Sequence, residues 1–111
     1  MSVVYFLQCT LTMRIKIGST DDLTTRIAAI NSANCAPARL LAAVSGGIDV
    51  ETYLHARFAG DRLNGEWFQP SNGLAEIIDA ACFGRFPYRD VRPMFRAERA
   101  GYARALATAI A

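Results

Sequence analysis

The chain has 111 residues, 52% of them hydrophobic, and a net charge of only +2. That length suits one compact domain and excludes two ordinary ones. No apolar run approaches the roughly 18 residues of a membrane span, and residues 1–5 lack the basic segment of a signal peptide. A cytoplasmic protein with no membrane partner is therefore expected.

The three cysteines, Cys9, Cys35 and Cys82, are far apart in the chain. They form no CxxC pair, and with a single histidine they make neither a disulfide framework nor a structural zinc site plausible. They are expected to be small buried residues, since free cysteine behaves as a small hydrophobe.

Three stretches of the chain have strand patterns. Residues 3–8 are a β-branched and aromatic run, which predicts a central strand covered on both faces. Residues 14–18 alternate cations and glycine with isoleucines, which predicts a second strand with one buried face. Residues 9–13 between them are short enough for a hairpin. Residues 39–45 are expected to form the third strand.

The remaining stretches predict helices. Residues 20–22 offer a capping hydroxyl and two acids for a first turn, which predicts that a helix begins there. Asp49 is expected to cap a second helix. A third helix should begin near Ser71, and a last one should run from about Pro93 to Ile110, because proline is favoured in a first turn. The apolar stripes are Leu23, Ile27 and Ile30; Val50, Tyr53, Leu54 and Phe58; and Leu74, Ile77 and Ile78.

These elements predict a small α+β domain over residues 1–84, a three-stranded, mainly antiparallel sheet flanked by helices. Residues 85–111 are expected to add a helical extension with six arginines against two acidic residues. Such a basic arm can contact phosphates without reading sequence, or it is the solvated face of an amphipathic helix. Its candidate nucleic-acid contacts are Arg96, Arg99 and Arg104.

Several short motifs follow one another before residue 71. They are Val4-Tyr5-Phe6, Lys16-Ile17-Gly18, Arg26, Glu51-x-x-x-His55 and Gly65-Glu66-Trp67-Phe68. In this order and spacing the chain resembles the GIY-YIG nuclease superfamily, in the branch found in phage open reading frames and meiotically up-regulated fungal genes. The resemblance implies the small antiparallel sheet with helices. Lys16 stands where the superfamily has its second tyrosine, which leaves the identity of the general base open.

The resemblance implies a divalent-metal-dependent endonuclease that hydrolyses DNA phosphodiesters, with RNA as a further possible substrate. Tyr5 or Lys16 would activate the water, and Arg26 would stabilise the pentavalent phosphate. Glu51 would hold one Mg²⁺ or Mn²⁺, and His55 would assist proton transfer.

The residue types permit the same chemistry from physical arguments. Arg26 falls at the margin of its helix's apolar stripe, where a guanidinium suits bidentate phosphate contact; it is otherwise an exposed helix arginine. Glu51 and His55 are four residues apart and share one helix face. There a carboxylate can hold a divalent cation and a histidine can pass a proton, or they are a first-turn acid and a packed ring.

Tyr5 is expected on a central strand with a hydroxyl that needs a partner. If the strand register places Lys16 beside it, the ammonium lowers the pKa of the phenol; the alternatives are a core tyrosine and a solvated lysine. Glu66 is a candidate to orient His55 or Arg26, or to make a second metal contact. Trp67 and Phe68 are expected to fill the core.

Two rival functions follow from the same residues. A non-catalytic nucleic-acid binding module would keep the scaffold without turnover, and Lys16 in the second motif favours it. A protein-interaction domain of a phage or mobile element would dock a partner, or a second copy as a homodimer, through the C-terminal helix.

Overall fold

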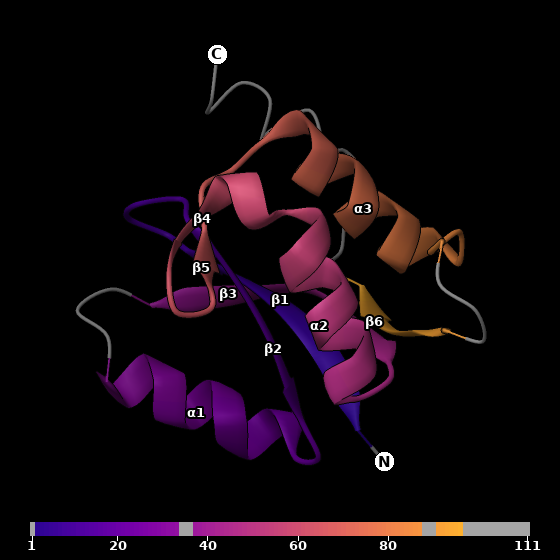
Figure 1. Cartoon of the computed structure of the whole chain (residues 1–111). Coiled ribbons are helices and arrows are strands. Elements are labelled where there is room, and N and C mark those ends of the chain that lie inside the picture. Colours follow the sequence, from indigo (N-terminus) through magenta and orange to yellow (C-terminus); the bar gives the residue numbers. More distant parts are fainter. Residues whose placement is uncertain (1, 34–36, 88–90, 97–111) are drawn as a thin grey trace.

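The structure is a computed structural model that describes residues 2–33, 37–87 and 91–96. A single sheet lies at its centre, with strand order β4-β5-β2-β1-β3-β6 and antiparallel pairing between all neighbours (Figure 1). The strands are β1 (Val3–Cys9), β2 (Ile15–Thr20), β3 (Ala38–Ser45), β4 (Arg62–Asn64), β5 (Trp67–Phe68) and β6 (Pro93–Arg96). The helices are α1 (Leu23–Ala33), α2 (Ile48–Arg57), the 3-10 turn η1 (Ala59–Asp61) and α3 (Asn72–Phe83).

The predicted α+β class and the three long strands are confirmed, but the sheet is wider than expected. Strands β2, β1 and β3 form its centre, and β1 is buried from Val3 to Gln8, as a strand covered on both faces requires. The three added strands have two to four residues each. Segments this short carry no periodicity of their own, so only pairing with a longer neighbour makes them strands.

Residues 93–96 correct the predicted last helix. Instead of starting a helix at Pro93, they form β6, which pairs with Ala42, Ala43 and Val44 of β3. Proline is tolerated at the start of an edge strand as well as in a first helical turn, and β3 offers a free edge at this point. The remainder of the predicted helix, and most of the extension 85–111, fall outside the described residues.

The capping residue agrees with the prediction for one helix and differs for two. Ser71 caps α3, and its Oγ accepts a hydrogen bond from the Leu74 amide at 3.1 Å. At α1 the cap is Asp22 and not the Thr20 hydroxyl: the Thr25 amide donates to Asp22 Oδ1 at 3.1 Å, and this bond lowers the pKa of Asp22. Helix α2 begins at Ile48, so Asp49 lies in its first turn and the cap position belongs to Gly47.

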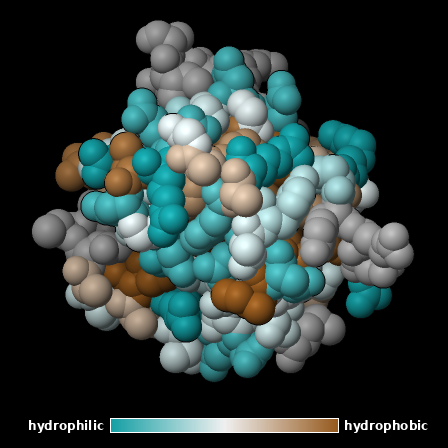
Figure 2. Space-filling view, viewed as in Figure 1, coloured by the Kyte–Doolittle hydropathy of each residue, from teal (hydrophilic) through white to brown (hydrophobic). Residues whose placement is uncertain are grey.

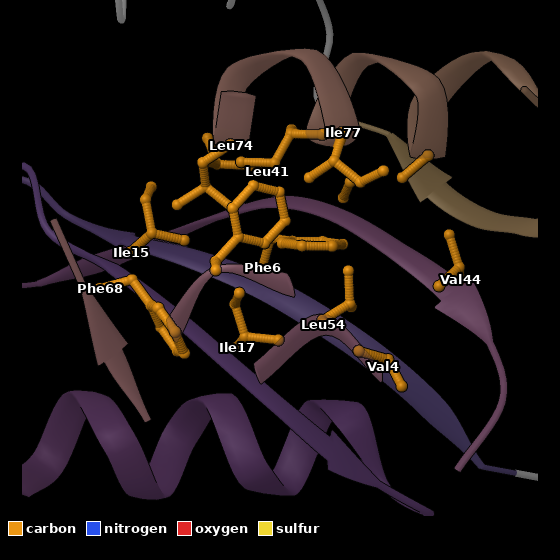
Figure 3. Packing of buried hydrophobic residues seen from close by; sticks show 14 of the residues in the cluster. Val4, Phe6, Ile15, Ile17, Leu41, Val44, Leu54, Phe68, Leu74 and Ile77 are labelled. Atoms are coloured by element: carbon orange, nitrogen blue, oxygen red, sulfur yellow. The ribbon is translucent and has the colours of Figure 1, made fainter. Parts of the chain in front are cut away.

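Hydrophobic residues pack on both faces of the sheet. On one face Phe6 lies among Leu41, Leu54 and Leu74 (Figure 3), in a cluster to which α2 and α3 contribute. On the other face Tyr5 belongs to a smaller cluster covered by the stripe of α1. The sheet therefore separates α1 from α2 and α3, and chemistry that needs side chains of both layers must take place at an edge.

The surface and the cysteines give little to distinguish the chain. The face in Figure 2 is mainly hydrophilic, with small separate apolar patches. In the described part of the chain no helix is long and apolar enough to cross a membrane. Cys9 and Cys82 are only partly buried, whereas full burial was expected, and Cys35 lies outside the described residues.

Candidate functional site

The candidate site lies along the edge of β2, beyond the point where β5 stops. Strand β5 pairs with β2 only at Ile15 and Lys16. At the next residue the β2 backbone forms hydrogen bonds with groups outside β5. The Ile17 amide donates to the Glu66 carbonyl at 3.0 Å, and His55 Nε2 contacts the Ile17 carbonyl at 2.9 Å. This edge brings α2 and the β4–β5 turn to the same place as β2.

Gly18 gives the site its central space. It lies opposite Tyr5 in the β1–β2 register. A Cβ atom on Gly18 would lie 2.5 Å from the Tyr5 hydroxyl oxygen and 2.8 Å from Glu66 Oε1. Both distances are shorter than real Cβ contacts. The missing side chain therefore lets a phenol and a carboxylate from different elements occupy the same space.

Tyr5 is fully buried, and among the described residues its hydroxyl has no hydrogen-bond partner. Burial raises the pKa of Tyr5, and the negative charges of Glu66 and Glu51 add to the rise, while the Arg26 guanidinium opposes it. An unsatisfied buried hydroxyl is costly. Positive charge brought close to Tyr5 by a ligand would favour the phenolate.

The expected influence of Lys16 on Tyr5 is not found. Lys16 pairs with Leu7, two positions along the strand from the pair that Tyr5 makes with Gly18. Its ammonium forms an ion pair with Glu66 Oε1 at 3.2 Å and lies over the Trp67 ring at 5.5 Å from the centroid. The register that the expectation required, with Lys16 beside Tyr5, therefore does not occur, and burial raises the pKa of Tyr5.

Two carboxylates approach each other in the site. Glu51, on the inner side of α2, is 8% exposed, and Ser19 Oγ donates to its Oε1 at 2.6 Å. Burial raises the pKa of Glu51; the Ser19 hydrogen bond opposes this effect, and the neighbouring Glu66 carboxylate reinforces it. A divalent cation between the two acids would remove their repulsion.

His55 fastens α2 to β2. Because the Ile17 carbonyl can only accept, Nε2 must carry the proton of their 2.9 Å hydrogen bond. The ring also packs edge-on against Phe68 at a centroid distance of 5.1 Å, and Nε2 lies 3.7 Å from Glu51 Oε2. The proton on Nε2 is thus already engaged, and the contacts give His55 a structural role besides the predicted proton transfer.

An open hollow of about 570 Å³ lies beside Ser19 and Arg26. Neither Glu51 nor Glu66 lines it. Arg26 lines it from α1. Ser19 lines the same hollow and bonds Glu51, so the hollow reaches the acid through this hydroxyl. The other lining residues are Ser2, Thr20, Asp21, Asp22, Gly47 and Ile48.

The residues fit a metal ion that protein and substrate hold together. In the ranges that the structure describes, no group of three or more His, Cys, Asp and Glu side chains could hold a metal alone. Mg²⁺, however, commonly takes one or two carboxylates and completes its shell with water and substrate phosphates. Glu51 and Glu66 are the two carboxylates here that would hold such an ion.

The candidate site residues predicted within residues 1–84 gather around one edge of the sheet and come from five different elements or turns. These are Tyr5, Lys16, Arg26, Glu51, His55 and Glu66. Of the tail arginines, Arg99 and Arg104 lie outside the described residues, and the side chain of Arg96 does too. Sequence reasoning missed Ser19. Strand alternation is the signal that finds it, because Ser19 follows Ile17 on the face that α2 covers.

A family model, the T5orf172 domain, matches residues 2–83. This domain occurs in phage open reading frames and is associated with nuclease-type proteins. The matched range includes every residue gathered at the β2 edge. No curated protein and no solved structure is significantly similar to the chain.

Proposed function

Because this chain belongs to the T5orf172 domain family, we propose that it is a divalent-metal-dependent endonuclease that hydrolyses DNA phosphodiesters. The observation that carries the proposal is that the Tyr5 hydroxyl and the Glu66 carboxylate meet at Gly18, with the Glu51 carboxylate next to Glu66. Two neighbouring carboxylates, one of them buried, favour binding of a cation. Arg26 adds a guanidinium suited to phosphate.

The residues divide the work of phosphodiester hydrolysis. Glu51, with Glu66 as second carboxylate, would hold one Mg²⁺ or Mn²⁺, which supplies charge neutralisation at the scissile phosphate. Arg26 would stabilise the negative charge that builds on the pentavalent phosphate. The tail arginines Arg96, Arg99 and Arg104 would contact the DNA backbone, as the sequence predicts.

Between the two candidate bases we favour Tyr5. The Lys16 ammonium is occupied by Glu66 at 3.2 Å, whereas the Tyr5 hydroxyl has no hydrogen-bond partner in the described residues. Burial raises the pKa of Tyr5, so the phenolate needed for catalysis becomes more abundant as pH rises. The rate should therefore increase with pH until the phenol has lost its proton.

The first test is cleavage of supercoiled plasmid. The purified chain is expected to nick it with Mg²⁺ or Mn²⁺ and to stop when EDTA removes the metal, because the acids alone cannot neutralise the phosphate. Arg26→Ala is the matched inactive control, and nicking is followed on agarose gels. Nicking that persists in excess EDTA would contradict the metal dependence.

Lys16→Arg tests the choice of base, because arginine keeps the charge and cannot readily give up a proton. If Lys16 acts through its ion pair with Glu66, this variant should keep activity within a few-fold of the wild type. Tyr5→Phe should lose about 10²-fold or more in kcat, in the usual range for a general base. The measurement is the pH dependence of kcat for all three proteins.

The opposite pattern would reassign the base. A Lys16→Arg variant without activity beside an active Tyr5→Phe variant would identify Lys16 as the proton acceptor. Since both changes keep the side chain's bulk, unfolding in urea should show closely similar stabilities, which separates chemistry from folding.

One observation favours a second function, a nucleic-acid binding module without turnover. The Tyr5 hydroxyl is shielded from solvent in this structure, and a base must reach its water. Such a module would bind DNA with an affinity that falls steeply with salt, and neither Mg²⁺ nor Mn²⁺ would lead to nicking.

A further inference from the structure

From the geometry we infer that Ser19 is a positioning residue for Glu51: its hydroxyl fixes the carboxylate that meets the metal ion. The inference rests on the proposed function, because it assigns Glu51 to the metal. Ser19 Oγ donates to Glu51 Oε1 at 2.6 Å, the distance of a strong hydrogen bond to a charged acceptor.

The fold makes this contact specific. Ser19 follows Ile17 on the face of β2 that α2 covers, and its backbone is paired with Val4 in the β1–β2 ladder. The donor therefore stands on a rigid strand, while the acceptor stands on a helix. His55, one turn further along α2, is tied to the Ile17 carbonyl of the same strand. These two contacts, at Ile17 and Ser19 of the same strand, thus fix the rotation of α2 about its own axis.

The hydroxyl also satisfies a buried acid. Glu51 is 8% exposed, so its carboxylate needs a hydrogen-bond donor from the protein, and Ser19 supplies one to Oε1. Ser19 also lines the hollow that Arg26 lines from α1. Side chains that hydrogen-bond a metal ligand typically change metal affinity by about 10- to 100-fold.

The test is Mn²⁺ binding to the full chain, followed by electron paramagnetic resonance, for four proteins. Ser19→Ala should weaken Mn²⁺ binding by about 10-fold or more, and Ser19→Thr, which keeps the hydroxyl, should restore most of the affinity. Thr20→Ala is the matched control. Thr20 lines the same hollow, but its hydroxyl accepts from the Asp22 amide at 3.1 Å and does not contact Glu51, so wild-type affinity is expected.

The outcomes separate this inference from the proposed function. If Ser19→Ala binds Mn²⁺ like the wild type, or if Ser19→Thr fails to rescue it, the positioning role is overturned and the endonuclease proposal stands. If Thr20→Ala is weakened equally, the effect belongs to the hollow as a whole and the assignment to Ser19 is wrong. If the wild type binds no Mn²⁺, the metal-dependent function fails, and this inference fails with it. Urea unfolding of each variant confirms that all four proteins are folded.

Discussion

Gly18→Ala is expected to reduce DNA cleavage by at least about 10²-fold in a protein that still folds. The added Cβ would lie 2.5 Å from the Tyr5 hydroxyl oxygen and 2.8 Å from Glu66 Oε1. The Glu66 side chain is on a turn and can move, but Tyr5 belongs to the rigid central strand. Misplacing a catalytic group by about 1 Å can cost roughly 10²-fold in rate. Single-turnover cleavage at saturating Mn²⁺ measures the effect.

The same crowding should lower the free energy of unfolding by about 1 to 3 kcal/mol, the usual range for overpacking. Gly60→Ala is the matched control, because an added Cβ there meets nothing within 4 Å. It should leave both activity and stability close to wild type. Full activity in Gly18→Ala would show that the Tyr5 hydroxyl and the Glu66 carboxylate need not share this space, and the site built around Gly18 would be wrong.

Stability offers an independent check on the same contact. Tyr5→Phe in the Gly18→Ala background removes the hydroxyl oxygen at 2.5 Å from the new Cβ but keeps Cζ at 2.7 Å, so the double variant should recover only a small part of the lost stability. Recovery beyond the sum of the single changes indicates direct contact between the two positions. Activity should not return, since the hydroxyl proposed as the base is gone.

The parts of the fold that the sequence predicts well are those with a local pattern. Strand β1 is apolar from Val3 to Leu7, and α3 combines an apolar stripe with a capping serine, so local chemistry is enough for both. Strands β5 and β6 have no such pattern. Whether Trp67 pairs with Lys16, or Pro93 with Val44, is decided by the free edges of longer strands, which no window of sequence contains.

The site shows the same division. Motif order identifies the residues that gather at the β2 edge, because spacing along the chain survives in the sequence. The contacts among them depend on register and helix rotation. In the β1–β2 register Tyr5 lies opposite Gly18, and Lys16 lies opposite Leu7. A shift of two residues in this register would place Lys16 opposite Tyr5, and the sequence alone does not decide between the two registers. Likewise, Ser19 reaches Glu51 only because α2 lies across this part of β2, which is a tertiary fact.

Glu51→Gln is expected to give a folded protein that binds DNA and does not cut it, with a loss of order 10²-fold or more, roughly 3 kcal/mol in the barrier. Glutamine keeps the size and an oxygen that can accept from Ser19, but it carries no charge for the metal. Burial and Glu66 both raise the pKa of Glu51, so an ionised Glu51 lowers the free energy of unfolding. Removing that charge should leave the free energy of unfolding unchanged or higher. Cleavage is measured with excess Mn²⁺, and DNA binding by fluorescence anisotropy.

Two comparisons make the Glu51 result decisive. Glu76→Gln changes an exposed glutamate of α3 and should cut normally, which excludes a general effect of lost charge. Glu66→Gln removes the second carboxylate together with the ion pair to Lys16, and should reduce activity less than Glu51→Gln if Glu51 is the principal ligand. Should Glu51→Gln cut like the wild type while Glu66→Gln is inactive, the metal belongs to Glu66. Glu51 would then be a buried acid that Ser19 and His55 hold for the sake of the α2–β2 contact.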